Sequence, residues 1–158
     1  MQVIGFNFSK ISAEKFPDFK QVPITTNIEI TDLQKEKIPL LKEQEAMKFL
    51  FNYSLTYDEQ KPQESSQEKS PKEEKNKSPT PKSNPLAKID LNGQIILSTT
   101  KEESKNFQDS WKKKQIPQSA QLFLYNIILR KSASKTLQLQ EELGLPSHLP
   151  LPKIEPKN

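Results

Sequence analysis

The sequence predicts an α+β fold: a four-stranded antiparallel sheet followed by C-terminal helices that pack on one face of it. Two observations lead to this prediction. Apolar and polar side chains alternate through four segments in the first part of the chain, which is the period of half-buried strands. Beyond them the apolar residues recur with helical spacing, and strands followed by helices are typical of an α+β layer fold. The chain has 158 residues, about one domain's length, so we expect a single domain over residues 1–158.

The two clearest strand patterns lie at residues 47–57 and 87–97. In each of them every second residue is apolar, aromatic or, at one position, glycine. We expect these two strands to pair as an antiparallel hairpin. The glycine is Gly93, and its mid-strand position indicates either a β-bulge or a close contact with Trp111.

Two weaker strand patterns come earlier, at residues 4–8 and 24–31. Pro23 opens the second of them, at a position where a strand tolerates a missing backbone N–H. The connections between the four strands suit a meander, so we expect each strand to lie beside the next one in the chain. Such an antiparallel sheet buries one face only.

The last third of the chain predicts two helices. A short helix at residues 102–114 places Phe107 and Trp111 on one face. A longer helix begins at Pro117 and ends at Gly144, a residue type common just beyond helix ends. Its residues are apolar nearly all round, so we expect it to be buried on more than one side.

Residues 59–85 contain no aliphatic, aromatic or methionine side chain, and their five Glu nearly cancel their six Lys. Such a segment has no apolar surface to offset its ordering entropy, so we expect a disordered insertion. Either it is a tolerated loop, or it is a regulatory or partner-binding loop with Ser-Pro and Thr-Pro pairs at Ser70, Ser78 and Thr80. Residues 146–158 predict an extended, proline-rich tail.

The sequence contains few of the residues that commonly form catalytic, metal or phosphate sites. Cysteine is absent and His148 is the one histidine, which argues against a zinc site or a thiol nucleophile. The three glycines are scattered, so no phosphate-binding loop is formed. We therefore expect no enzyme, no catalytic residue, no cofactor and no metal, and we expect His148 to be a packing or surface residue.

The net charge is +4, and Arg130 is the one arginine among 24 basic residues. Lysine acts as a point charge, so non-specific contact with polyanions is favoured over sequence-specific nucleic-acid recognition. Trp111 precedes three lysines, but acidic residues on the same helix favour a core tryptophan at a solvated helix end. No apolar run is long enough to span a membrane and the start lacks a signal-peptide pattern, so we expect a cytoplasmic protein without membrane insertion.

The order of these elements resembles the SecB-like export chaperones. In that family a strand like residues 47–57 is followed by one like 87–97, with a glycine where Gly93 stands here. A long apolar helix, a shorter helix and a proline-containing end then follow. The resemblance lies in element order and apolar pattern and includes no diagnostic motif. Two blocks, residues 4–11 and 145–153, also resemble uncharacterised archaeal proteins of similar size.

The resemblance implies an ATP-independent holdase that binds non-native polypeptides, with a link to protein export, and that assembles as a homo-oligomer, a dimer or tetramer. This chain is basic and lacks a Cys/His tail, which puts docking on a translocase in doubt. The polypeptide-binding residues we predict are Phe107, Trp111, Ile116, Phe123 and Tyr125. The alternative is a non-catalytic binding or assembly subunit of an RNA-containing particle such as the ribosome.

Overall fold

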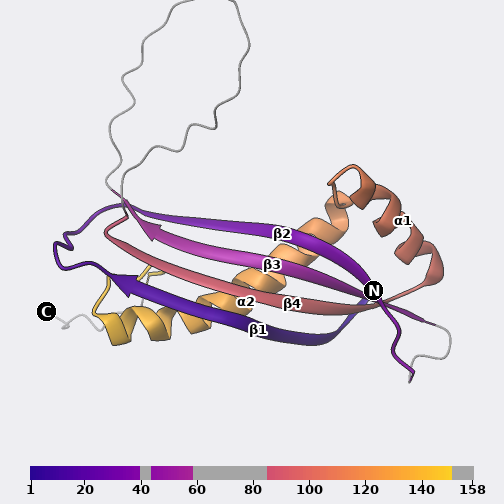
Figure 1. Ribbon diagram of the computed structural model, residues 1–158, viewed down its shortest axis with the longest axis horizontal. Helices are drawn as coiled ribbons and strands as arrows, with labels where there is room; N and C mark the ends of the chain where they lie inside the picture. The colour runs from indigo at the N-terminus through magenta and orange to yellow at the C-terminus, as the bar shows by residue number, and fades with distance from the viewer. Residues whose placement is uncertain (40–43, 59–84, 151–158) are drawn as a thin grey trace, which may run out of the picture.

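The computed structural model describes residues 1–39, 44–58 and 85–150 and contains four strands followed by two helices. The elements are β1 (Gln2–Lys15), β2 (Ile24–Glu36), β3 (Glu45–Tyr57), β4 (Ala87–Thr99), α1 (Lys101–Lys112) and α2 (Gln118–Leu143). The predicted α+β fold is confirmed (Figure 1). The predicted disordered insertion lies outside the described residues except for its last residue, Pro85, and so do residues 151–158 of the predicted tail.

The strands lie in the order β1-β4-β3-β2, so the predicted meander is wrong. The predicted hairpin of β3 and β4 is present, with Tyr57 opposite Ala87 at the end where the chain connects the two strands. β1 pairs with β4 and not with β2, which makes the sheet a four-stranded Greek key. Burial accounts for this order: alternate residues of β4 from Ala87 to Leu97 are fully buried, which suits a central strand, whereas residues 25–27 of β2 are exposed and suit an edge.

β1 and β2 are longer than predicted, at 14 and 13 residues, and β-bulges explain the difference. The pairing register shifts between Val3 and Gly5 and between Phe8 and Lys10 in β1, and between Ile30 and Asp32 in β2. Each extra residue reverses the phase of the alternation. The apolar pattern therefore ends at a bulge although the strand continues beyond it.

Gly93 lies where β1 and β3 approach β4 closely. A Cβ atom at this position would be 2.6 Å from the Asn7 carbonyl oxygen and 2.6 Å from the Phe51 ring. The predicted close contact therefore involves Asn7 and Phe51, and the expected contact with Trp111 is wrong. The predicted bulge lies opposite, in β1, immediately after Phe8, which pairs with Gly93.

α1 begins with a capping box formed by Thr100 and Glu103. The Glu103 N–H donates to Thr100 Oγ1 at 3.2 Å, and the Thr100 N–H donates to Glu103 Oε2 at 3.0 Å. α2 begins at Gln118, one residue after the predicted start, with Pro117 as its N-cap, and the Gln121 N–H donates to the Pro117 carbonyl at 2.9 Å. The short helix precedes the long one, as the residues predict, which is the reverse of the order that the family resemblance implied.

α2 crosses one face of the sheet diagonally, from the β2 side near α1 towards the β1 side (Figure 1). Its buried residues are four positions apart: Ala120, Leu124, Ile128, Ser132, Thr136 and Gln140. A step of four residues turns about 40° beyond one helical turn, so the line of contact winds round the helix. On the outer side Leu122 and Leu129 are 59 % and 43 % exposed. Within one chain α2 is thus buried on one side, and the predicted burial on more than one side stays a prediction that needs a cover from outside the chain.

The C-terminal end of α2 is fixed to both the sheet and the following segment. Gly144 ends the helix as predicted, in the left-handed conformation with φ 62°. The N–H of the buried Leu145 then donates to the Gln140 carbonyl at 2.8 Å. Lys15 Nζ, at the end of β1, donates to the Leu143 carbonyl at 3.1 Å. A cation is favourable there because the carbonyl groups at a helix C-terminus carry partial negative charge.

Candidate functional site

Phe107, one of the five predicted binding residues, lies in the core. Its side chain is 5 % exposed, and its ring meets that of Phe49 edge-on with centroids 5.5 Å apart. This geometry is a favourable one for aromatic pairs. Phe107 therefore anchors α1 to β3 and does not lie at an accessible surface.

Trp111, Ile116 and Tyr125 come together at one cavity, which we call the Trp111 pocket. It lies between β2, the loop joining the helices and the first turns of α2, and its volume is about 490 Å³. Its lining residues are Ile28, Glu29, Ile30, Trp111, Lys114, Gln115, Ile116, Gln121 and Tyr125. Pockets that bind small organic groups have volumes of about 300–1,000 Å³. The pocket is therefore large enough to accept a side chain of a bound polypeptide.

Charged and amide groups hold the walls of the Trp111 pocket. Lys114 Nζ lies 5.0 Å from the centroid of the Trp111 ring, within the range of a cation–π interaction. Lys114 itself has φ 56°, which is uncommon for a residue other than glycine. Gln121 Nε2 donates to the Tyr125 hydroxyl at 3.2 Å. These contacts orient both aromatic side chains without filling the space between them.

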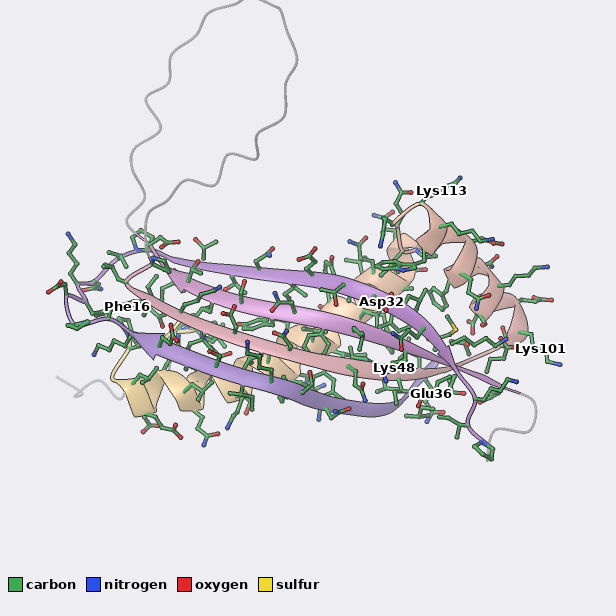
Figure 2. All side chains as sticks on the ribbon, viewed as in Figure 1. Phe16, Asp32, Glu36, Lys48, Lys101 and Lys113 are labelled. Atoms are coloured by element: carbon green, nitrogen blue, oxygen red, sulfur yellow. The ribbon has the colours of Figure 1, made fainter. Side chains whose placement is uncertain are left out.

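Two residues of the Trp111 pocket, Lys114 and Trp111, influence the carboxyl group of Asp32 in β2. Hydrogen bonds from the Gln34 side chain and from the Leu33 N–H, both at 2.8 Å, lower the pKa of its carboxyl group. Lys114 and Trp111 lower this pKa further by smaller amounts. Asp32 is thus an anion at neutral pH. Figure 2 labels Asp32 on β2, and it labels Lys101 and Lys113 at the two ends of α1.

Phe123, the fifth predicted residue, does not line the Trp111 pocket. It is half-buried and packs against the hydrophobic core. The structure therefore brings three of the five predicted residues together. It adds Ile28 and Ile30 from β2, which the sequence pattern identifies as strand residues but cannot place beside a helix.

A second cavity, the β1–α2 groove, lies at the opposite edge of the sheet and was missed in the sequence. Its volume is about 770 Å³, and it is lined by Val3, Phe8, Ile127, Arg130, Lys131, Ser134, Lys135 and Gln138. The diagonal path of α2 explains why there is space beside the helix at both edge strands. The sequence does contain a signal for it, because the three basic residues of α2 all fall within six positions, 130–135.

The sheet face turned away from α2 is polar. Residues on this face include Asn52 opposite Asn92, Ser54 opposite Asp90 and Leu50 opposite Gln94. The aromatic residues of the described strands lie on the other face: Phe6, Phe8, Phe49, Phe51, Tyr53 and Tyr57. Sheet-based RNA-binding domains stack bases on exposed aromatic rings. This polar face therefore lacks what that mode of RNA binding needs.

His148 packs beside the end of α2, with Nδ1 2.9 Å from Gln140 Oε1, and burial lowers its pKa.

Across residues 1–39, 44–58 and 85–150, no group of three or more His, Cys, Asp or Glu side chains could hold a metal ion. None of the helices in this part of the chain is both long and apolar enough to cross a bilayer.

No protein-family model matches this chain, and no curated protein matches it significantly. A solved structure with a similar arrangement is the Mycobacterium tuberculosis Rv1957 SecB-like chaperone in complex with a ChAD peptide from the Rv1956 HigA1 antitoxin. The TM-score is 0.44 and the sequence identity is 13 %, over 99 % of this chain and 92 % of that chain. At this distance the likeness carries no functional argument. The resemblance to archaeal proteins stays a prediction.

Proposed function

We propose that this protein is an ATP-independent holdase, which binds exposed segments of non-native polypeptides and catalyses no reaction. The observation that supports this function best is the position of the Trp111 pocket beside an edge strand. β2 has β3 as its one neighbour in the sheet of the described chain. An aromatic-lined pocket thus lies next to a strand whose outer backbone groups have no partner strand.

An edge strand suits a binding protein with many clients. Its free N–H and C=O groups can pair with any extended polypeptide, because every polypeptide has the same backbone groups. Ile28 and Ile30 of β2 line the Trp111 pocket, so a client strand paired with β2 would lie beside it. In this mechanism the backbone pairing gives affinity, and the pocket selects an apolar or aromatic client residue.

β2 also carries features that prevent two copies from pairing edge to edge. Glu29 is exposed and Asp32 is partly exposed, and a bulge interrupts the strand between Ile30 and Asp32. Charges and bulges on edge strands are known means of avoiding aggregation. The edge is therefore open to a flexible client segment while it disfavours a second rigid sheet.

The outer side of α2 is the surface that we assign to self-association. Leu122 and Leu129 are exposed there although the same helix is buried on its other side. A second copy of the chain would cover them, so the proposal includes a homodimer or a tetramer. We place the holdase in the cytoplasm, where clients awaiting export are one class of non-native chain.

The alternative function is a non-catalytic binding or assembly subunit of an RNA-containing particle. Arg130, Lys131 and Lys135 favour it, because they line one groove and no ion pair of the described residues involves them. The polar sheet face, without aromatic rings, argues against it. We therefore keep the holdase as the principal proposal.

The test is light scattering from a chemically denatured client diluted into buffer with a near-stoichiometric amount of this protein. The wild type is expected to suppress aggregation. Trp111→Ala should weaken the suppression and Trp111→Phe should restore much of it. Leu149→Ala, which removes an exposed apolar side chain outside the Trp111 pocket, is the matched control and should behave like the wild type. Circular dichroism checks that each variant is folded. Failure of the wild type to suppress aggregation would refute the proposal.

A further inference from the structure

The β1–α2 groove combines an apolar surface with a cluster of cations. Val3, Phe8 and Ile127 supply the apolar part, and all three also pack against the hydrophobic core. The cations come from one stretch of α2: Arg130, Lys131 and Lys135. The volume of about 770 Å³ is within the range of ligand-binding clefts. Such a surface suits a ligand that has apolar and anionic parts close together.

The three cations have no compensating charge within the groove. No carboxylate is among its lining residues, and no ion pair of the described residues includes any of the three. Lys135 Nζ donates to Gln138 Oε1 at 3.1 Å, a neutral partner. Like charges on neighbouring turns repel each other, so an arriving carboxylate would relieve this repulsion as well as gain its own attraction.

We propose that the β1–α2 groove binds acidic–apolar segments of client polypeptides, in which an aliphatic or aromatic residue is flanked by Asp or Glu. This inference rests on the proposed holdase function and adds a charge preference to it. The apolar client residue would contact Val3, Phe8 and Ile127, and the flanking carboxylates would pair with the cations of α2. The Trp111 pocket has Glu29 as well as Lys114 in its wall and supplies no such preference.

A second copy of this chain is a poor occupant of the groove. In a two-fold dimer the same patch faces itself. The three cations of one copy would then face the same three cations of the other. The exposed Leu122 and Leu129, which do not line the groove, remain available for self-association.

RNA is also a poor occupant. Single-stranded RNA is held by stacking its bases on exposed aromatic faces as well as by cations. Phe8 is the one aromatic residue of the groove, and its ring packs edge-on against Phe6 and Phe51 with centroids 5.2 Å and 6.3 Å apart. The aliphatic surface offers contacts that a polypeptide side chain uses and a phosphate backbone does not.

The test measures fluorescence anisotropy of three short labelled peptides with the full-length protein. The first has a central Leu-Phe pair flanked by Asp, the second has the same centre flanked by Lys, and the third has Ser at the centre and Asp at the flanks. The first is expected to bind about tenfold or more tightly than either of the others. The preference over the Lys peptide should decrease as salt is added, because screening weakens charge attraction.

Two pairs of variants locate the binding. Lys131→Glu should remove most of the preference for the Asp-flanked peptide, whereas Lys105→Glu makes the same charge change on an exposed site of α1 and should leave it intact. Ser134→Trp places bulk in the groove and should block the peptide, and Ser119→Trp, exposed at the start of α2 outside the groove, should not.

Four results of these experiments would contradict the proposed charge preference of the β1–α2 groove. Equal binding of the Asp and Lys peptides by a protein that still suppresses client aggregation would refute the charge preference alone. Absence of peptide binding together with absence of aggregation suppression would refute the proposed function itself. If polyuridylate bound more tightly than the Asp-flanked peptide and Lys131→Glu abolished that binding, the groove would be an RNA site. If Lys131→Glu changed the sedimentation coefficient but not peptide binding, the groove would be a contact between copies.

Discussion

The hydroxyl of Tyr57 in β3 accepts a hydrogen bond from Gln140 Nε2 of α2 at 2.5 Å and donates one to the Pro146 carbonyl at 2.7 Å. Gln140 Oε1 in turn lies 2.9 Å from His148 Nδ1. Sheet, helix and C-terminal segment therefore meet at one buried phenol. The second half of α2 is thus fixed by polar contacts, whereas its first half packs through Leu124 and Ile128.

Tyr57→Phe should lower the free energy of unfolding by about 1–3 kcal/mol, because it leaves the buried Gln140 amide and the Pro146 carbonyl without their partner. Urea denaturation measures this change. Tyr125→Phe is the matched control, since its hydroxyl bonds to the Gln121 side chain at the wall of an open pocket. Its cost should be less than about 1 kcal/mol. Equal costs for the two variants would show that the Tyr57 contacts do not fix α2.

Stability should fall as the pH decreases below about 6.5, the ordinary pKa of histidine. Burial lowers the pKa of His148, and its Nε2 has no hydrogen-bond partner among the described residues. The unfolded chain therefore takes up a proton at a higher pH than the folded chain does. Stability is complete above the unfolded pKa and is lost progressively as the pH falls towards the folded pKa.

Urea midpoints measured between about pH 7.5 and 5.5 test this dependence. His148→Gln should remove it. The carboxyl groups of Asp32, Glu45 and Asp109 do not interfere, because their pKa values are lowered from ordinary values of 3.8 to 4.5 and they titrate below this range. An unchanged slope in His148→Gln would assign the pH dependence to another group.

Gly93→Ala should destabilise the protein by about 1–3 kcal/mol, the usual cost of overpacking a filled core. The added methyl group would meet the Asn7 backbone and the Phe51 ring at 2.6 Å. Gly5→Ala is the control, because its Cβ would meet only the Ile96 side chain, at 3.4 Å. Alanine is favoured over glycine within a strand by about 0.5–1 kcal/mol, so Gly5→Ala should be neutral or stabilising. Thermal unfolding of both variants checks the contrast.

The strand positions could be predicted from the sequence, but their order could not. Alternation shows which side chains share a face, and this was sufficient for β3 and β4. It does not show which strand is the neighbour, so β1 was expected beside β2. The structure shows why β4 is central: Ile89, Leu91, Ile95 and Leu97 are all fully buried, which suits a strand with a neighbour on each side.

The long helix shows a second limit of pattern analysis. Its leucines suggested burial all round, yet the sheet contacts Ser132, Thr136 and Gln140 in the second half. These polar residues are buried because α2 passes over Tyr53 and Tyr57, whose pKa values burial raises. Similarly, the Trp111 pocket could be predicted only in part. Ile28 and Ile30 line it because β2 lies beside the loop between the helices in the folded protein, and the sequence pattern does not show which strand is beside that loop.

Replacing residues 59–84 by a short Gly/Ser turn should leave the melting temperature unchanged or slightly raised. The sequence of this segment offers no apolar side chain to the core. The ends it joins are already close, since the Leu86 N–H donates to the Tyr57 carbonyl at 2.8 Å. Shortening a loop from about 27 to 5 residues recovers at most about 1.5 kcal/mol of closure entropy. A large loss of stability would show that the segment packs against the domain.

Raising the salt concentration should distinguish client binding through the Trp111 pocket from binding through the cations of α2. Contacts to RNA phosphates release counterions, so their affinity falls steeply as the salt concentration rises. Contacts between apolar surfaces persist or strengthen, because salting-out ions favour burial. Suppression of client aggregation through the Trp111 pocket should therefore persist when potassium sulfate is raised to moderate concentrations. If moderate salt abolished binding to the unfolded client, a pocket lined by Trp111, Ile116 and Tyr125 would not be the site that holds it. The cations of α2, which we propose pair with acidic client segments and which would also attract a polyanion, would then carry the binding, and the comparison of polyuridylate with the Asp-flanked peptide would identify which of the two is bound.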